Sequence, residues 1–170
     1  SILQAGKIPN GNYLFNFSLA TENGIMIHEF NKSIEVYEPS YIELIEPGGS
    51  LNNVEENIIF SSLPSFMWEM DQCSNCNLGI RVCEFNPNIH TSTTDAINSL
   101  SKLPISSYDK FYLINSQFQS YQYPPSNSLP LESGKMYVWQ LKRTYNTTVG
   151  SRDLYTPIKI FKIATNVSNN

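Results

Sequence analysis

The 170-residue chain has few charged residues: Asp, Glu, Lys and Arg make up only 15% of it, against about a quarter in an ordinary globular protein. Its 11 basic residues form no dense cluster and the net charge is −4, which argues against nucleic acid as a partner, because that needs a basic patch. No apolar run reaches the roughly 18 residues of a membrane span. Asn, Ser, Thr and Tyr fill the polar positions, and we interpret this composition as that of an extracellular or cell-surface protein.

The sequence also lacks the residue patterns of catalysis and cofactor binding. Its two histidines, His28 and His90, belong to no Ser-His-Asp or Cys-His arrangement, so we interpret both as surface residues. The eight glycines are spread out as turn residues and form no phosphate-binding loop. No calcium-binding loop motif occurs, although a calcium site joining Glu69, Asp71 or Asp153 across loops stays open. We therefore expect no enzyme activity and no cofactor.

The chain contains two copies of one pattern, in which aromatic and apolar residues occupy alternate positions after a glycine. The first copy is Gly11, then Tyr13-x-Phe15-x-Phe17, then Ile34-x-Val36. The second copy is Gly134, then Tyr137-x-Trp139-x-Leu141, then Ile158-x-Ile160. The tyrosine and the first isoleucine have the same separation in both copies. Such alternation is typical of a strand with one buried face, so each copy predicts a β-hairpin with a long loop.

The first copy predicts an N-terminal β-hairpin, residues 1–39, with strands at about 12–20 and 32–38. Asn23-Gly24 is a turn signal between them, and Pro39 ends the pair because proline cannot donate to a β-ladder. No opening strands precede this hairpin, so we expect it to be the closing part of a preceding or neighbouring sandwich. Its apolar residues would then form a subunit interface, at Tyr13, Phe15, Phe17, Ile34 and Val36.

The rest of the chain predicts a second domain, residues 40–166, followed by a tail at 167–170. Strand candidates lie around 41–45, 58–61, 66–68, 78–82, 111–114 and 118–123, with turn signals between them. Thr93-Thr94-Asp95 predicts the cap of one short helix at about 94–101. Many short strands separated by turns favour an antiparallel β-sandwich.

The residues of this second domain resemble immunoglobulin-like or fibronectin-type-III-like repeats of large bacterial surface proteins. The resemblance is carried by Ile45-x-Pro47, Pro64-x-Phe66-x-Trp68, Leu78-x-Ile80-x-Val82 and Gly134-x-x-Tyr137-x-Trp139-x-Leu141. It covers about residues 40–164, and the hairpin at 1–39 looks like the tail of a preceding repeat. The resemblance implies an Ig-like sandwich with Trp68 in the core between two sheets and Trp139 packed on the penultimate strand. The helix at 94–101 is an insertion relative to the plainest members.

Three cysteines and one histidine are spaced as C-x2-C-x6-C-x6-H, at Cys73, Cys76, Cys83 and His90. These four side chains match the ligand types of a Cys3His zinc site. A disulfide is the stronger interpretation in an extracellular protein. All three pairings among Cys73, Cys76 and Cys83 stay open, and each leaves one cysteine over.

Two features suggest contact with glycans. Four tyrosines could form a stacking platform for sugars, at Tyr121, Tyr123, Tyr145 and Tyr155. Four Asn-x-Ser/Thr sequons occur, at Asn16, Asn31, Asn146 and Asn166. Asn16 alternates with Phe15 and Phe17, so it should face outward if those two face a core.

These observations favour a structural subunit of an extracellular or cell-surface fibre. We expect neighbouring subunits, or adjacent repeat domains, to assemble head to tail by β-strand addition from the hairpin. The alternative is an adhesin or carbohydrate-binding module of a longer secreted protein. Because Ser1 is not an initiator methionine, we expect the chain to be a processed product or a fragment.

Overall fold

The computed structural model describes residues 11–36, 41–71, 73, 76–123, 126, 128–147 and 150–165. The chain divides into two compact units, Ser1–Pro39 and Ser40–Asn170. Both are built mainly of antiparallel strands, so the predicted all-β class is confirmed. Among the described residues, no helix has the length and hydropathy needed to cross a membrane.

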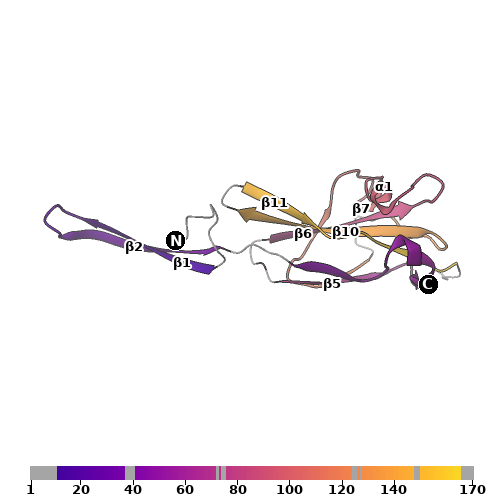
Figure 1. The fold of residues 1–170 in the computed structure, drawn as a ribbon, viewed down its shortest axis with the longest axis horizontal. Helices are drawn as coiled ribbons and strands as arrows, with labels where there is room; N and C mark the ends of the chain where they lie inside the picture. Colours follow the sequence, from indigo (N-terminus) through magenta and orange to yellow (C-terminus); the bar gives the residue numbers. More distant parts are fainter. Residues whose placement is uncertain are drawn as a thin grey trace. The chain divides into compact units, whose positions relative to one another are not determined.

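The first unit is a single hairpin of two long strands, β1 (Gly11–Ala20) and β2 (Met26–Val36) (Figure 1). The predicted long loop is wrong, because the second strand begins at Met26 and not near residue 32. A tight turn joins the strands: the Thr21 amide donates to the Ile25 carbonyl, and Gly24 has a φ of +79°, which suits glycine. The period-two alternation continues back to residue 28, which lets the ladder extend toward this turn.

The second unit contains two sheets. The small sheet has the order β3-β5-β9, with β3 (Ile42–Glu46), β5 (Ser65–Met70) and β9 (Ser120–Gln122). The large sheet has the order β4-β12-β10-β6-β7, with β4 (Ile58–Ile59), β12 (Lys159–Ile163), β10 (Met136–Thr147), β6 (Cys76–Phe85) and β7 (Ser101–Leu103). Two further strands extend it, β11 (Gly150–Tyr155) beside β10 and β8 (Tyr112–Ile114) beside β6.

The two sheets pack face to face over one hydrophobic core. Trp68 of the small sheet and Trp139 of the large sheet are both buried in it. The Phe66 ring lies 4.8 Å from the Trp139 ring, and the Trp139 indole donates to the Pro47 carbonyl at 2.8 Å. The bridging residues come from alternate positions of each strand, as expected when one face of a strand is buried. The unit is therefore sandwich-like.

A second, smaller core lies on the other face of the large sheet. Here Cys83, Val138 and Ile160 pack under the α-helix α1 (Thr93–Ile97) and the 3-10 helix η1 (Leu51–Glu56). The central strands of the large sheet are covered on both faces. The residues of β6 are therefore buried at nearly every position, and their burial does not alternate. The prediction of a single helix needs two corrections. The 3-10 helix η1 was not predicted, and α1 begins after its cap Ser92, whose hydroxyl accepts from the Asp95 amide.

The two copies of the sequence pattern do not have the same pairing. In the hairpin, Tyr13 lies opposite Ile34. In the second unit, Tyr137 lies opposite Phe161, three residues beyond Ile158, and the intervening chain forms β11 against the far half of β10. The equal spacing in sequence therefore does not reflect a structural repeat.

Candidate interaction surface

The hairpin of residues 11–36 sorts its side chains onto two very different faces. Directly opposite residues of an antiparallel pair project to the same side, and successive residues alternate between sides. Because Tyr13 opposes Ile34 and Phe17 opposes Phe30, nearly all large apolar residues of the paired region fall on one side. We call this side the apolar face; it consists of Tyr13, Phe15, Phe17, Leu19, His28, Phe30, Lys32, Ile34 and Val36.

The apolar face is exposed. Phe15, Phe17 and Ile34 are 42%, 47% and 43% exposed, so roughly half of each side chain is covered by its neighbours on the hairpin. The Phe17 and Phe30 rings stack at 4.8 Å with 12° between their planes. Burying the remaining halves would contribute about 1 kcal/mol per residue, since full burial of such a side chain contributes about 1.5–3 kcal/mol.

All five residues predicted for a subunit interface belong to this face: Tyr13, Phe15, Phe17, Ile34 and Val36. Sequence reasoning missed Phe30, because it placed residue 30 in a loop. A signal for it was present, since Phe30 continues the period-two alternation that leads through Lys32 to Ile34. His28, predicted as a surface residue, is exposed on the same face, with its ring 6.2 Å from that of Phe30.

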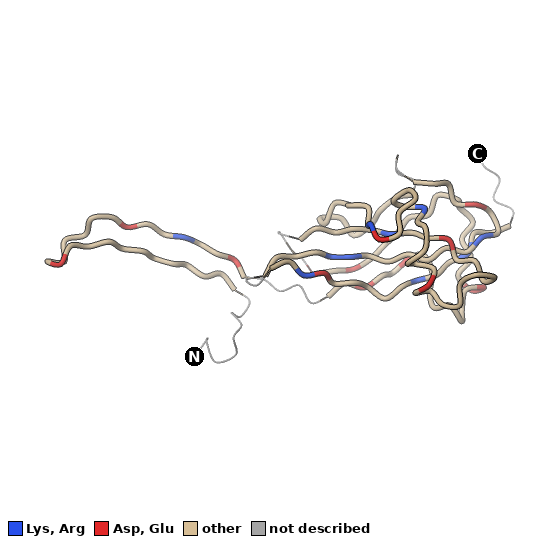
Figure 2. The backbone as a smooth tube through the Cα atoms, turned by 90° about the horizontal axis from the view of Figure 1, so that it is seen from above, with Lys and Arg blue, Asp and Glu red and all other residues tan. Residues whose placement is uncertain are grey.

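The opposite side, which we call the polar face, carries Asn12, Leu14, Asn16, Ser18, Glu29, Asn31, Ser33 and Glu35. Two sequon asparagines, Asn16 and Asn31, lie directly opposite each other there. Lys32 is the only basic residue between positions 11 and 36, and β1 has no charged residue at all (Figure 2). The two faces of the hairpin therefore differ in polarity, and the apolar one is exposed.

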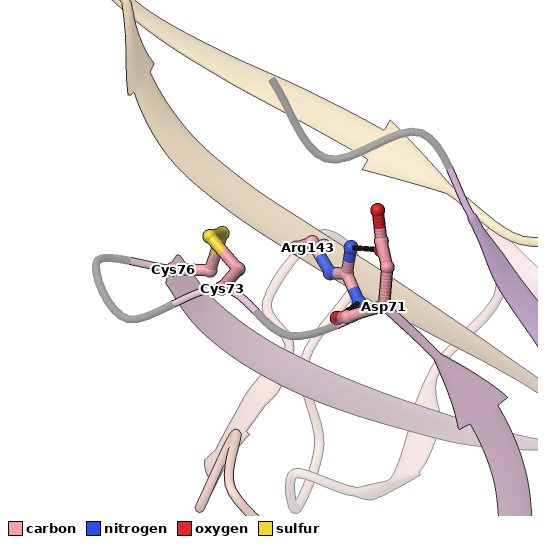
Figure 3. The surroundings of a disulfide bond; sticks show 4 residues. All are labelled: Asp71, Cys73, Cys76 and Arg143. Carbon is pink, nitrogen blue, oxygen red and sulfur yellow. Dashed lines mark hydrogen bonds and ion pairs between the residues drawn. A yellow bond between two sulfur atoms is a disulfide. The ribbon is translucent and has the colours of Figure 1, made fainter. Parts of the chain in front are cut away.

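The cysteines form one disulfide, between Cys73 and Cys76, whose Cα atoms are 5.5 Å apart. Figure 3 shows this disulfide beside an ion pair in which Arg143 Nη1 of β10 lies 2.5 Å from Asp71 Oδ1. The Arg143 side chain is only 1% exposed and also donates to the Asp71 carbonyl. The ion pair and the disulfide hold the two ends of the β5–β6 connection, which is a structural role.

The zinc interpretation is wrong, because its four residues do not converge. Cys73 and Cys76 are bonded to each other, and the buried Cys83 thiol donates to the Ile97 carbonyl. His90 Nδ1 accepts from the Asn86 amide at 3.0 Å. Among the described residues, no group of three or more His, Cys, Asp and Glu side chains is placed to hold a metal ion.

The other candidate sites are dispersed too. For the calcium site, Asp71 pairs with Arg143, whereas Asp153 accepts from the Thr144 hydroxyl at 2.6 Å. For the sugar platform, Tyr123 is fully buried and donates to the Leu129 carbonyl. Tyr121 packs partly buried against the core, and its hydroxyl makes no hydrogen bond with any described residue. Tyr145 of β10 and half-exposed Tyr155 of β11 project to opposite faces, because Tyr155 lies opposite Lys142 and Tyr145 lies opposite Arg152.

No protein-family model matches the chain, and no curated protein is significantly similar to it in sequence. The role of the protein therefore has to be argued from its geometry. Of the candidate sites, the apolar face of the hairpin is the one whose predicted residues lie together on one surface.

Proposed function

We propose that the chain is a structural module of an extracellular or cell-surface assembly, in which the hairpin packs its apolar face onto a β-sheet of a neighbouring Ig-like sandwich. The observation that carries this proposal is the apolar face itself, with three of its central side chains more than two-fifths exposed. A two-stranded hairpin is marginal in water without a surface to pack on. The long outer edges of β1 and β2 also offer backbone groups for strand addition, an edge-to-edge contact separate from the packing of the apolar face.

The second unit supports the sandwich part of the proposal. Its two sheets, which are mainly antiparallel, bury Trp68 and Trp139 between them, as the resemblance to Ig-like repeats implies, with α1 as an insertion. The Cys73–Cys76 disulfide suits an oxidising, extracellular setting. The alternative role, carbohydrate binding, loses its main support because Tyr123 is buried.

A chain that carries both a donor hairpin and an acceptor sandwich makes a heterologous contact with its neighbours. Such a contact produces a ring if the rotation closes and a filament if it does not. This is the physical basis for proposing a fibre subunit.

The test replaces Phe15 and Phe17 together with Asp in the full chain. Each carboxylate would have to be desolvated in the contact, which an apolar interface does not tolerate. The matched control is Asn16→Asp with Ser18→Asp, which places the same two charges on the polar face of the same strand. Sedimentation over a concentration series and negative-stain electron microscopy report assembly, and tryptophan fluorescence reports the fold of the second unit.

We expect wild type and the control to self-associate with rising concentration, and the Phe15/Phe17 variant to stay monomeric with an unchanged emission spectrum. Assembly that persists in the Phe15/Phe17 variant, or a wild-type chain that stays monomeric at every concentration, would contradict the proposal.

A further inference from the structure

The small sheet of the second unit has an outward face that is open and mixed in character. Leu44, Phe66 and Trp68 point into the core, so the alternate residues point outward. We call this the acceptor face; it consists of Glu43, Ile45, Glu46, Ser65, Met67, Glu69, Ser120 and Gln122, flanked by Tyr41. Ile45, Met67 and Tyr41 are 38%, 43% and 43% exposed and supply apolar area.

The large sheet offers less open surface over its centre. There α1 and η1 cover the outward face of β6, β10 and β12, whereas none of the described helices packs against the small sheet. Figure 1 shows α1 and β5 on opposite sides of β10. The acceptor face is therefore a sheet face on which another sheet can lie.

All three charged residues of the acceptor face are acidic, and among the described residues none of them has a basic partner. Glu43 and Glu69 lie directly opposite each other, an arrangement that destabilises a sheet. The Tyr41 hydroxyl is within hydrogen-bond distance of both carboxylates: it donates to Glu43 at 2.9 Å and to Glu69 at 3.4 Å. The face thus has a negative centre that a cation would stabilise.

The apolar face of the hairpin has the complementary charge. Lys32 lies opposite Phe15 in the middle of it, and the acidic residues Glu29 and Glu35 lie on the polar face. Lys32 makes no ion pair with any described residue. An aromatic surface with a central lysine matches a sheet face with three apolar side chains around a pair of glutamates.

From this match we infer that the acceptor face receives the apolar face of the hairpin from a second copy of the chain, with Lys32 between Glu43 and Glu69. The inference rests on the proposed function and adds the surface at which the copies meet. The donor and the acceptor face lie on one chain, and the Glu43–Glu69 pair lacks the cation that Lys32 supplies, which is why we infer a second copy as the occupant.

The size of the two faces predicts a weak individual contact. The strands β3, β5 and β9 have five, six and three residues. At a rise of about 3.3 Å per residue and a spacing of about 4.8 Å between strands, the acceptor face has a projected area of about 220 Å². That is well below the roughly 800 Å² per partner of a standard stable interface. We therefore expect association that depends strongly on concentration and on salt.

A charge swap in the full chain tests the inference. Lys32→Glu and Glu69→Lys each place like charges together across the contact, and we expect each to weaken self-association at least about tenfold. The double variant Lys32→Glu with Glu69→Lys restores an opposite pair and should recover association. The control, Glu29→Lys, changes a charge on the polar face of the hairpin and should leave association unchanged.

Cysteine cross-linking tests the position directly. A chain with Lys32→Cys is mixed under mild oxidation with a differently tagged chain with Glu69→Cys, so that only a contact between chains can join the two tags. The native cysteines do not compete, because Cys73 and Cys76 are bonded and Cys83 is buried. We expect a mixed disulfide dimer, and none when Glu29→Cys replaces Lys32→Cys.

Failure of this inference can be told from failure of the proposed function. If the Phe15/Phe17 variant abolishes assembly while the charge swap and the cross-link show no effect, the hairpin packs elsewhere and only the acceptor face is wrong. If wild type never associates, both are wrong. Recovery by the double variant together with the cross-link would support both.

Discussion

Arg81 of β6 is expected to be one of the most sensitive positions of the second unit. Its side chain is 2% exposed and faces the outward side of the large sheet. It donates to four backbone carbonyls, those of Ile97, Ser99, Ser107 and Lys110, at 2.7–2.8 Å. One guanidinium thus holds the end of α1 and the segment up to residue 110 against the sheet.

The magnitude follows from the carbonyls that would lose their donor. In Arg81→Met, the Ser107 carbonyl keeps its bonds from Ser101, and the Ile97 carbonyl keeps the Cys83 thiol. The Lys110 and Ser99 carbonyls would be left with no donor or a weak one. Each buried unsatisfied group costs about 1–3 kcal/mol, and relief of the buried charge offsets part of this. We expect a loss of about 3 kcal/mol, a large share of the roughly 5–15 kcal/mol of a typical domain.

Urea unfolding followed by tryptophan fluorescence measures this loss, because Trp68 and Trp139 both lie in the core. Arg152→Met on exposed β11 is the control and should stay within about 1 kcal/mol of wild type, because the contacts of an exposed charged side chain contribute little. Arg81→Lys keeps the charge but not the planar fork of donors, so it should lose most of the same stability. A Lys variant as stable as wild type, or a Met variant no worse than the control, would refute this reasoning.

Two further predictions concern buried polar groups. Tyr121→Phe should leave the free energy of unfolding unchanged or raise it, because it removes a buried hydroxyl that has no hydrogen-bond partner among the described residues. Urea unfolding measures this free energy, and a loss above about 1 kcal/mol would mean that the hydroxyl is satisfied. Burial raises the pKa of the Cys83 thiol to about 11, above that of the unfolded thiol, so stability present below pH 9 should fall between about pH 9 and 11. Cys83→Ala should flatten that part of the pH profile of unfolding, and an equal slope in both proteins would show that the thiol is not responsible.

Strands were the part of the fold that the sequence predicted best, because apolar and polar residues alternate along a strand that has one buried face. The alternation at Tyr13-x-Phe15-x-Phe17 predicts β1, and that at Phe66-x-Trp68 predicts β5. The alternation at Leu78-x-Ile80-x-Val82 also predicts β6, although this strand is buried at nearly every position. What the alternation does not signal is that Arg81 and Cys83, on the outward side of β6, are buried too, because the segment around α1 covers that face.

The sites were less accessible, because they depend on contacts between distant parts of the chain. Their spacing in the sequence suggested that Cys73, Cys76 and Cys83 could bind one metal ion. In the structure, β6 places the Cys83 thiol in the smaller core, on the outward face of the large sheet. Nothing in the local sequence around Glu43 signals that Glu69 will lie opposite it. Cross-strand pairing decides both outcomes, and register is a property of the whole sheet.

The Arg81 contacts bear on the proposed assembly as well as on stability. By holding the end of α1 on the large sheet, Arg81 helps keep Val138 and Ile160 of the outward core covered. Without that cover the large sheet would present a second apolar face, and an aromatic hairpin would have two surfaces to choose from. A destabilised Arg81 variant should therefore form irregular aggregates that Lys32→Glu does not dissolve, whereas ordered association through the acceptor face should remain sensitive to that charge.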